Sequence, residues 1–177
     1  MNDQQDLRGY YEDHPEMVSS PFGGVKSFDD QLWKQLSSRF HLDIRGHRTL
    51  DVGCGRGLIE PVLKEQGAAE YVGADLVRSF EQREAGPEKF CLAESGSLPF
   101  RDECFGSVLC FDAFEHFPDP AQAAREFARV LSPMGFFFLS IPNYFNMAGI
   151  VKWYEERFGS YEKNTWAPFG SCAPQAQ

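Results

Sequence analysis

The sequence predicts an α/β fold in which helices cover a doubly wound, mostly parallel sheet. Short apolar runs of strand type alternate along the chain with segments whose apolar residues recur every three or four positions. The strand-type runs are apolar throughout, which is typical of strands that are buried on both faces. Parallel neighbours in a sheet need crossover connections, and the helical segments between the runs supply them.

The first regular element that we expect is a helix over residues 29–40, with Ser27 as its N-cap. The apolar face of this helix is predicted to consist of Leu32, Trp33, Leu36 and Phe40. Residues 1–26 are polar and contain several turn-forming prolines and glycines. We therefore assign residues 1–46 to an N-terminal cap segment and helix.

A core of alternating strands and helices is expected over residues 47–158. Strands are predicted at residues 49–52, 71–74, 90–93, 107–111 and 136–141. Helices are predicted at residues 58–66, at 77–84, from Asp119 and Pro120 onward, and at 150–158, with a turn at 132–135. The predicted apolar face of the helix after Pro120 consists of Ala124, Phe127, Val130 and Leu131. Residues 159–177 form an expected irregular tail.

Residues 50–57, which read LDVGCGRG, carry the strongest functional signal. An apolar strand ends here in three glycines at every second position, Gly53, Gly55 and Gly57, and a helical run follows directly. Glycine permits a tight turn and the close approach of a ligand, and a helix N-terminus offers unpaired N–H groups. This layout is typical of nucleotide binding. Leu58 stands where a dinucleotide-binding motif needs its last glycine, which counts against a nicotinamide cofactor.

Acidic residues follow the next three predicted strands. Asp75 ends the second strand, 20 positions after Gly55, where its carboxylate can accept hydrogen bonds from two ribose hydroxyls. Glu94 follows the third strand and Asp112 follows the fourth. Because the carboxyl ends of parallel strands meet at one edge of a sheet, we expect these acids to lie along one rim with the glycine loop.

Together, these segments resemble the motifs of the class I S-adenosylmethionine-dependent methyltransferases, in particular the type 11 small-molecule group. The glycine loop resembles the family's motif Asp-x-Gly-x-Gly-x-Gly. The segment from Glu94 through Leu98-Pro99-Phe100 to Phe105 resembles the family's segment D-A-x-x-L-P-F…F-D, with Glu94 in place of the first Asp and Gly106 in place of the last. The resemblance spans roughly residues 47–143. It implies a Rossmann-like sheet and S-adenosyl-L-methionine as cofactor.

The resemblance also implies roles for individual residues. Asp75 would bind the ribose, and Glu94 with Ser95 would bind the adenine amino group. The expected cofactor-binding set is Asp51, Gly53, Cys54, Gly55, Gly57, Asp75, Leu76, Glu94, Ser95 and Asp112. His116 lies where the reacting methyl group should project and is the candidate general base, with packing among neighbouring phenylalanines as the alternative. The reaction would be in-line methyl transfer to a small-molecule or lipid-like acceptor.

The end of the chain departs from this family. The family usually continues after its fifth strand with a helix and an antiparallel hairpin, whereas this sequence offers only the helical pattern at 150–158. We therefore expect the hairpin to be lacking and strand 136–141 to form an apolar edge, which favours self-association or association with a partner. Another chain, the tail or the remainder of a longer protein are the three candidates for covering it.

Three alternatives to an active methyltransferase remain open. A non-catalytic or truncated subunit that binds the cofactor or a partner would account for the uncovered edge. A nicotinamide-dependent oxidoreductase would need the glycine that Leu58 replaces. A purely structural α/β module would bind no cofactor.

Composition excludes several other classes. The chain has 177 residues, enough for one domain with a core, and a formal net charge of -9 without a basic run, which argues against nucleic-acid binding. Five cysteines without a C-x-x-C pair indicate a reduced, cytoplasmic protein, and the histidines lack metal-ligand spacing. The polar N-terminus has no signal-peptide core, and no apolar run is long enough to span a membrane.

Overall fold

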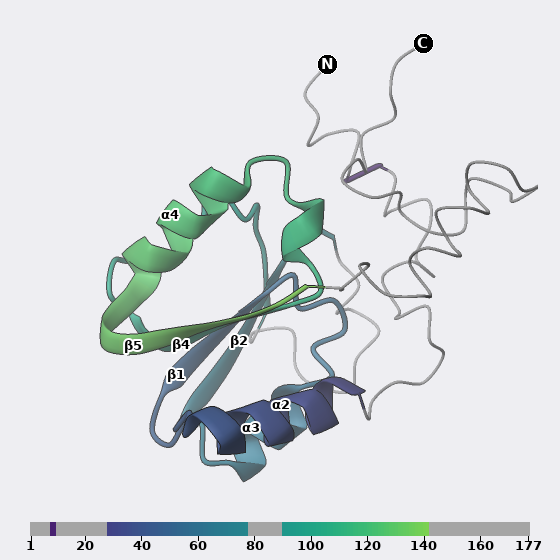
Figure 1. The fold of residues 1–177 in the computed structure, drawn as a ribbon. Coiled ribbons are helices and arrows are strands. Elements are labelled where there is room, and N and C mark those ends of the chain that lie inside the picture. Colours follow the sequence, from purple (N-terminus) through teal and green to yellow (C-terminus); the bar gives the residue numbers. More distant parts are fainter. Residues whose placement is uncertain (1–7, 10–27, 78–89, 142–177) are drawn as a thin grey trace, which may run out of the picture.

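The computed structural model of the chain describes residues 8–9, 28–77 and 90–141 (Figure 1). Its sheet has five strands in the order β3-β2-β1-β4-β5, and every pair of neighbours is parallel. The strands are β1 (Arg48–Val52), β2 (Glu70–Asp75), β3 (Phe90–Leu92), β4 (Phe105–Phe111) and β5 (Leu131–Ser140). The strand order reverses between β1 and β4, so the predicted doubly wound α/β fold is confirmed.

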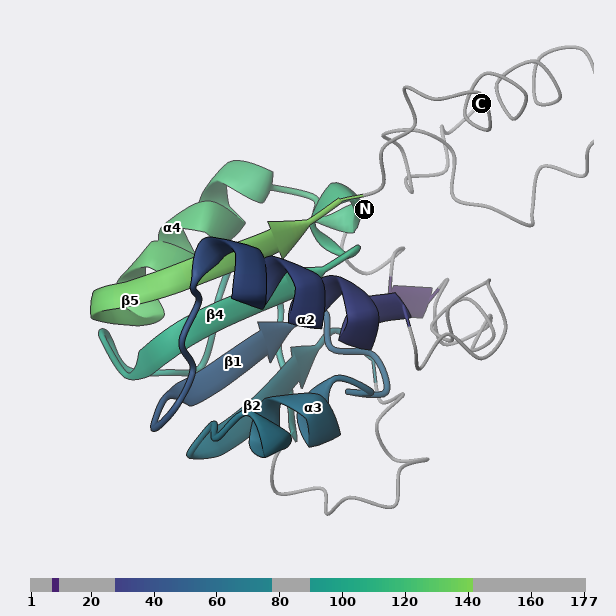
Figure 2. The ribbon, with the colours of Figure 1, turned by 60° about the horizontal axis from the view of Figure 1, so that its bottom comes forward.

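Helices cover both faces of the sheet. In Figure 1, α4 (Pro120–Val130) lies on one face, and α2 (Phe28–Phe40) and α3 (Glu60–Glu65) lie on the other. Figure 2 shows α2 passing over the middle of the sheet and α3 beside β2. A single 3-10 turn, η4 (Phe114–His116), follows β4. None of the described helices is both long and apolar enough to cross a membrane.

The two faces of β1 illustrate how the core is divided. Successive strand residues point to opposite sides. Leu50 and Val52 therefore lie in the core beneath α4, together with Phe127. Trp33 of α2 and Tyr71 of β2, which are both fully buried, belong to the core on the opposite face. Each face thus has its own apolar cluster, and the carboxyl ends of the strands are free to carry polar groups.

Two predicted helix faces were partly wrong. Trp33 of α2 is buried as expected, but Phe40 is 61% exposed because α2 ends at that residue and Ile44, after the turn, fills the core instead. In α4 the buried alanine is Ala123, whereas Ala124 is exposed. Ala123 shares one helical stripe with Phe127 and Val130, at spacings of four and seven residues, so the buried stripe begins one position earlier than predicted.

The turn predicted at 132–135 lies inside β5. Phe105 pairs with Leu131, but Ser107, two residues further along β4, pairs with Phe136, five residues further along β5. The extra residues form a bulge, and Met134 in this bulge has φ +66°. The turn-forming residues therefore distort the strand without ending it.

Other boundaries moved slightly. The helix predicted from residue 58 begins at Glu60, because residues 58 and 59 belong to the turn after the glycine loop. The predicted helices at 77–84 and 150–158, the tail at 159–177 and the expected loss of the hairpin fall almost entirely outside the described residues. The same holds for most of the N-terminal cap segment.

Candidate functional site

The glycine loop follows β1 at the carboxyl edge of the sheet. Gly53, Gly55 and Gly57 all have positive φ, at +74°, +50° and +57°. The N–H groups of Gly53 and Cys54 donate to the carbonyl of Ala74 in β2, at 2.8 and 3.2 Å. The loop is therefore fastened to the end of the neighbouring strand, and its conformation is one that other residues adopt at a cost.

A close contact joins the glycine loop to the segment after β4. A Cβ atom placed on Gly53 would overlap the Cβ of Ala113. No side chain larger than hydrogen fits at position 53 without displacing the segment that carries Asp112 and His116. The absence of a side chain at Gly53 therefore lets the segment after β4 pack directly against the glycine loop.

Asp75 ends β2 and contacts the glycine loop directly. Its Oδ2 accepts a hydrogen bond from the Gly55 N–H at 2.6 Å, and its Oδ1 accepts one from the Val77 N–H at 3.1 Å. Burial raises the pKa of Asp75, and the backbone hydrogen bonds partly oppose that rise. Because a carboxylate has about four acceptor positions, Asp75 keeps capacity for the hydroxyls of a ligand.

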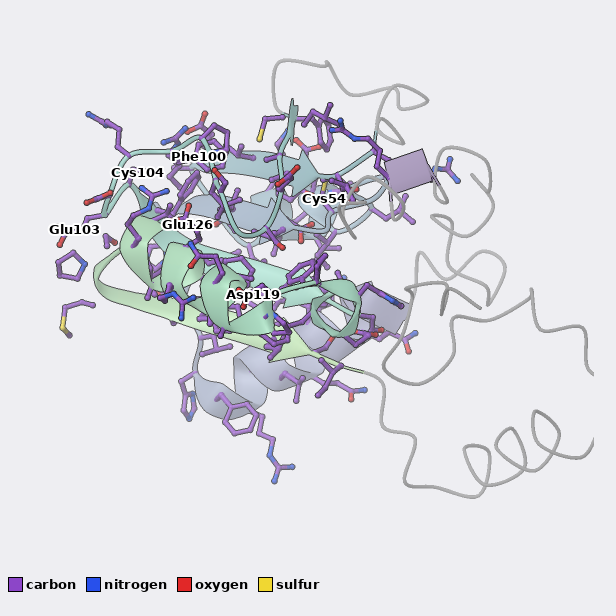
Figure 3. All side chains as sticks on the ribbon, turned by 90° about the horizontal axis from the view of Figure 1, so that it is seen from above. Cys54, Phe100, Glu103, Cys104, Asp119 and Glu126 are labelled. Carbon is purple, nitrogen blue, oxygen red and sulfur yellow. The ribbon has the colours of Figure 1, made fainter. Side chains whose placement is uncertain are left out.

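Asp51 and Cys54 lie beneath the loop rather than at its surface. Asp51, which is 3% exposed, accepts a hydrogen bond at 2.7 Å from the hydroxyl of the buried Tyr71. The Sγ of Cys54 packs so closely against Gly73 that a Cβ on that glycine would come within 2.7 Å of it. In Figure 3, Cys54 lies at one end of the strands, whereas Cys104, which precedes β4, lies at the other. The side chains of both predicted residues therefore support the loop from the core side.

Glu94 and Ser95 lie in a tight turn after β3. The Ala93 N–H donates to the carbonyl of Asp75 at 2.8 Å, and the Glu94 carbonyl accepts the Ser97 N–H at 3.0 Å. The Glu94 side chain is exposed and Ser95 is half-buried. This turn therefore begins at the end of β2, on the same edge of the sheet as Asp75.

Leu76 follows Asp75, and sequence reasoning missed its contact. The Leu76 carbonyl accepts a hydrogen bond at 3.2 Å from Nε of Arg8, a residue of the short N-terminal segment that the structure describes. No motif in the sequence connects two positions 68 residues apart. Arg8 is thus a basic side chain at this edge that only the folded chain reveals.

The segment after β4 gathers three ionisable side chains. Asp112 is exposed and has φ +45°; its carboxylate accepts a hydrogen bond at 2.9 Å from the Ser140 hydroxyl. Glu115 is half-buried, and both burial and the charge of Asp112 raise its pKa. Burial lowers the pKa of His116, whose Nε2 lies 3.8 Å from Oε1 of Glu115. Burial thus favours the neutral imidazole, the form that can accept a proton, and the charge of Asp112 partly opposes this shift.

The carboxyl end of β4 lies in a negative field. The pKa of the Cys110 thiol is raised well above its ordinary value, first by burial and then by the charges of Asp51, Glu115 and Asp112. The described residues contain no group of three or more His, Cys, Asp or Glu side chains that could hold a metal ion. The charges of three carboxylates therefore act on the carboxyl end of β4.

Most of the residues predicted from sequence do converge. The glycine loop, Asp75 with Leu76, the turn with Glu94 and Ser95, and the segment with Asp112 and His116 all follow carboxyl ends of neighbouring strands. Asp51 points into the core instead. Glu115 was not predicted; its position three residues after Asp112, beside His116, is the only signal that the sequence offers.

Comparison with known proteins identifies the same region. A sequence profile described as a methyltransferase domain matches residues 50–139, from the glycine loop strand to β5. Among curated proteins, the ubiquinone biosynthesis O-methyltransferase of Neisseria meningitidis serogroup C is 34% identical over 112 residues, or 58% of this chain and 47% of that protein. The demethylmenaquinone methyltransferase of Clavibacter sepedonicus is 31% identical over 138 residues, or 68% of this chain and 56% of that protein.

Solved structures agree with the sequence matches. The crystal structure of an S-adenosylmethionine-dependent methyltransferase from Mesorhizobium loti aligns with a TM-score of 0.52 at 30% identity. The alignment covers 60% of this chain and 51% of that chain. The chain spans about half the length of the curated relatives that it matches.

Proposed function

The chain belongs to the methyltransferase domain family, and we propose that it binds S-adenosyl-L-methionine at the strand-end rim and transfers the methyl group to a small-molecule acceptor. The contact between the Asp75 carboxylate and the Gly55 N–H carries this proposal. It brings the acid expected to bind ribose within hydrogen-bond distance of the loop expected to approach the cofactor, and burial of that acid is a feature common at functional sites.

The residues around the rim fit the cofactor. Asp75 would bind the ribose hydroxyls, and Glu94 with Ser95 would bind the adenine amino group from the adjoining turn. The three glycines of the loop, which carry no side chain, would let the methionine part approach the main chain closely. The complete proposed set is Asp51, Gly53, Cys54, Gly55, Gly57, Asp75, Leu76, Glu94, Ser95 and Asp112, of which Asp51 and Cys54 contribute by supporting the loop.

The charge of the rim supports a cationic cofactor. Asp112 and Glu115 follow β4 next to the glycine loop, and Asp51 adds its charge from below. S-adenosylmethionine, when bound, supplies an activated methyl group on a positively charged sulfur. The carboxylates would attract that charge, and the half-buried Phe114 and Phe117 would help to exclude water from the reacting centre.

The protein's part in the reaction is mainly positioning. Holding two reactants in line can supply roughly 7–11 kcal/mol of the barrier. His116 would take the proton of a hydroxyl acceptor, since burial favours its neutral imidazole. The relatives named for ubiquinone biosynthesis and for demethylmenaquinone support a small, lipid-like acceptor for this chain as well.

Calorimetric titration tests the cofactor before any acceptor is known. We expect S-adenosylmethionine and S-adenosylhomocysteine to release heat and saturate at one molecule per chain, and NAD to give no binding heat. Absence of heat with both adenosyl compounds would refute the proposal. Binding without transfer of a labelled methyl group to any hydroxylated aromatic acceptor would favour the non-catalytic alternative.

Association through β5 is a second proposal with its own observation. In the described part of the chain β5 is an edge strand, and the side chains of Phe137 and Leu139 on it are 40% and 37% exposed. Exposed apolar edges pair readily with other chains. We expect light scattering to give a mass above that of one chain, and a concentration-independent monomer would contradict this.

None of the four described cysteines forms a disulfide, which supports a reduced, cytoplasmic location.

A further inference from the structure

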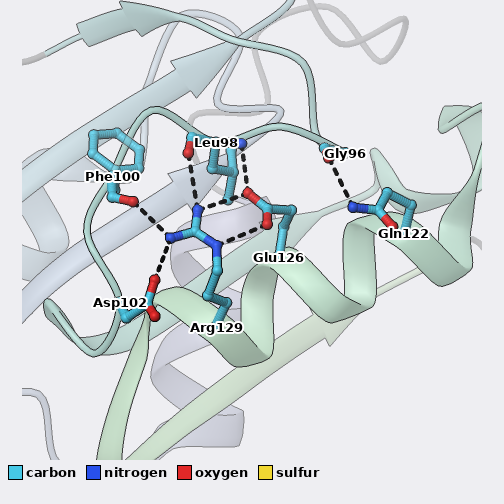
Figure 4. A network of polar contacts seen from close by, with 7 residues as sticks. All are labelled: Gly96, Leu98, Phe100, Asp102, Gln122, Glu126 and Arg129. Carbon is cyan, nitrogen blue, oxygen red and sulfur yellow. Dashed lines mark hydrogen bonds and ion pairs between the residues drawn. The ribbon is translucent and has the colours of Figure 1, made fainter.

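Three polar side chains of α4 face the loop that connects β3 to β4. They are Gln122, Glu126 and Arg129, which are four and three residues apart and so share one stripe of the helix. Figure 4 shows all three reaching toward the backbone of residues 96–102. We call this group the α4 clasp.

Arg129 makes the most contacts in the clasp. Its guanidinium donates to the carbonyls of Phe100 at 2.7 Å and Leu98 at 3.0 Å, and to the carboxylate of Asp102 at 2.8 Å (Figure 4). It also donates to both carboxylate oxygens of Glu126, at 2.8 and 2.7 Å. A planar guanidinium, with its five N–H donors, is the one side chain that can serve five acceptor atoms at once.

Glu126 and Gln122 extend the clasp toward β3. The Leu98 N–H donates to Glu126 Oε2 at 2.7 Å, and Gln122 Nε2 donates to the carbonyl of Gly96 at 3.2 Å. Gly96 lies so near that a Cβ on it would come within 3.1 Å of the Gln122 side chain. The helix thus binds the loop backbone at Gly96, Leu98 and Phe100.

The turn with Glu94 and Ser95 lies between two anchors. On one side, the Ala93 N–H is bound to the carbonyl of Asp75 at the end of β2. On the other side, the clasp begins at Gly96, one residue after Ser95. Two residues between fixed points have little backbone freedom, so the place from which the Glu94 side chain extends depends on α4, although α4 lies outside the rim.

We propose that Gln122, Glu126 and Arg129 are positioning residues for adenine recognition, which they perform by fixing the turn that carries Glu94 and Ser95. This inference rests on the proposed function, in which that turn binds the adenine amino group. The clasp binds backbone atoms rather than filling the core. Its contacts with the loop extend from Asp102 back to Gly96, which adjoins the turn. The clasp residues touch no substrate and act through Glu94.

The preference for one base over another tests this role. Calorimetry on the full chain would compare S-adenosylhomocysteine with S-inosylhomocysteine, in which oxygen replaces the adenine amino group. We expect the wild type to prefer the adenine compound. In Arg129→Met, we expect affinity for S-adenosylhomocysteine to fall about tenfold, the size of one lost charged hydrogen bond, and the base preference to fall toward one. The ratio of affinities for S-adenosylmethionine and S-adenosylhomocysteine, which reports the sulfur end, should not change.

Gln122→Met and Arg45→Met complete the experiment. Gln122→Met removes the contact nearest the turn and leaves Arg129 paired, so it should lower the base preference even if Arg129→Met does not fold. Arg45, in an exposed ion pair with Asp43 before β1, serves as the matched control and should leave the preference unchanged.

Two results would overturn the inference. One is a folded Gln122→Met or Arg129→Met protein that keeps the base preference of the wild type, because a merely structural clasp alters the unfolding midpoint and not that ratio. The other is a wild type that binds S-adenosylhomocysteine without preferring it to the inosine compound. A wild type that binds neither compound would instead refute the proposed function itself.

Discussion

Charged groups in the α4 clasp and at the strand-end rim are paired in different ways. In the clasp, the hydrogen bond from Arg129 lowers the pKa of Glu126, so the carboxylate is held in its charged form. At the rim, burial raises the pKa of Asp75 and of Glu115, and the charge of Asp112 raises that of Glu115 further. The charge of the clasp carboxylate is thus balanced by a cation, whereas the surroundings of the rim carboxyl groups disfavour their charged form.

The difference separates a region that stabilises the fold from the region that we propose to bind the ligand. Compensated charges strengthen the folded state, provided that the geometry is good. Uncompensated, partly buried carboxylates reduce stability, and a bound cation or hydroxyl donor would relieve that penalty. Substitutions of the clasp side chains should therefore alter stability as well as binding, whereas substitutions of the rim carboxylates should alter ligand binding with little change in stability.

The largest expected effect is on the backbone of the rim. Gly53→Ala should lower the free energy of unfolding by about 2–5 kcal/mol, because positive φ costs about 1–2 kcal/mol and the overlap with Ala113 adds about 1–3 kcal/mol. Denaturant unfolding at pH 7 measures this. Gly46→Ala is the matched control, since Gly46 has the same φ of +74° and open space around it. Equal losses in the two variants would mean that the contact with Ala113 is unimportant.

A rim substitution should separate binding from stability. Asp75→Asn should weaken S-adenosylmethionine binding at least tenfold, from loss of charged hydrogen bonds worth about 1.5–3 kcal/mol. The free energy of unfolding at pH 7 should change by about 1 kcal/mol or less, because removal of a buried charge offsets the loss of one acceptor. Calorimetry measures the affinity and denaturant unfolding measures the stability, both on the same sample. Unchanged affinity would remove Asp75 from the site.

A clasp substitution should show a pH-dependent loss of stability. Glu126→Gln should lower the free energy of unfolding at pH 7 by about 0.5–1.5 kcal/mol, a value kept small because the pair is partly solvated. Arg129 lowers the pKa of Glu126 below its ordinary 4.5, so this contribution is complete above about pH 5.5 and fades as the pH falls through the lowered value. Unfolding curves at several pH values between 3 and 7 measure it. A difference between wild type and variant that stays constant across this range would contradict the assignment.

The smallest effect is expected at an exposed pair. The side-chain hydrogen bond from Arg45 lowers the pKa of Asp43 to about 2. Both side chains are more than half exposed, however, and solvent screens such pairs. Arg45→Gln should therefore leave the unfolding midpoint within experimental scatter. A clear loss of stability would show that an ion pair can stabilise this fold without burial, and that burial is not what makes the clasp pairs stabilising.

The chain order of the motifs predicted the rim well. Parallel strands present their carboxyl ends at one edge, so the glycine loop, Asp75 and Glu94 had to meet once the strands were assigned. Gly55 and Asp75, 20 residues apart, are joined by a hydrogen bond that follows from this rule. Their roles toward the cofactor stay predictions.

Features that depend on a partner from elsewhere in the fold were not predictable. Gly106, where the family often has Asp, lies against the ring of His47, which a Cβ would approach to 2.8 Å. Phe40 satisfies the helical periodicity but is exposed at the last residue of α2. The backbone partners of Arg129 lie about 30 residues upstream on a loop without regular structure, so no periodic pattern in the sequence predicts them.

The helix α4 combines two neighbouring stripes, with Gln122, Glu126 and Arg129 each one residue before Ala123, Phe127 and Val130. One residue corresponds to a rotation of about 100° around the helix axis. A rotation of that size would bury the polar stripe and expose the apolar one. The polar side chains would then lose their hydrogen bonds to the loop, and the apolar side chains would lose their place in the core. The helix can therefore pack in only one rotation about its axis. Deletions or insertions in the preceding segment 117–119 would disturb its packing on the sheet and its hydrogen bonds to the loop at the same time.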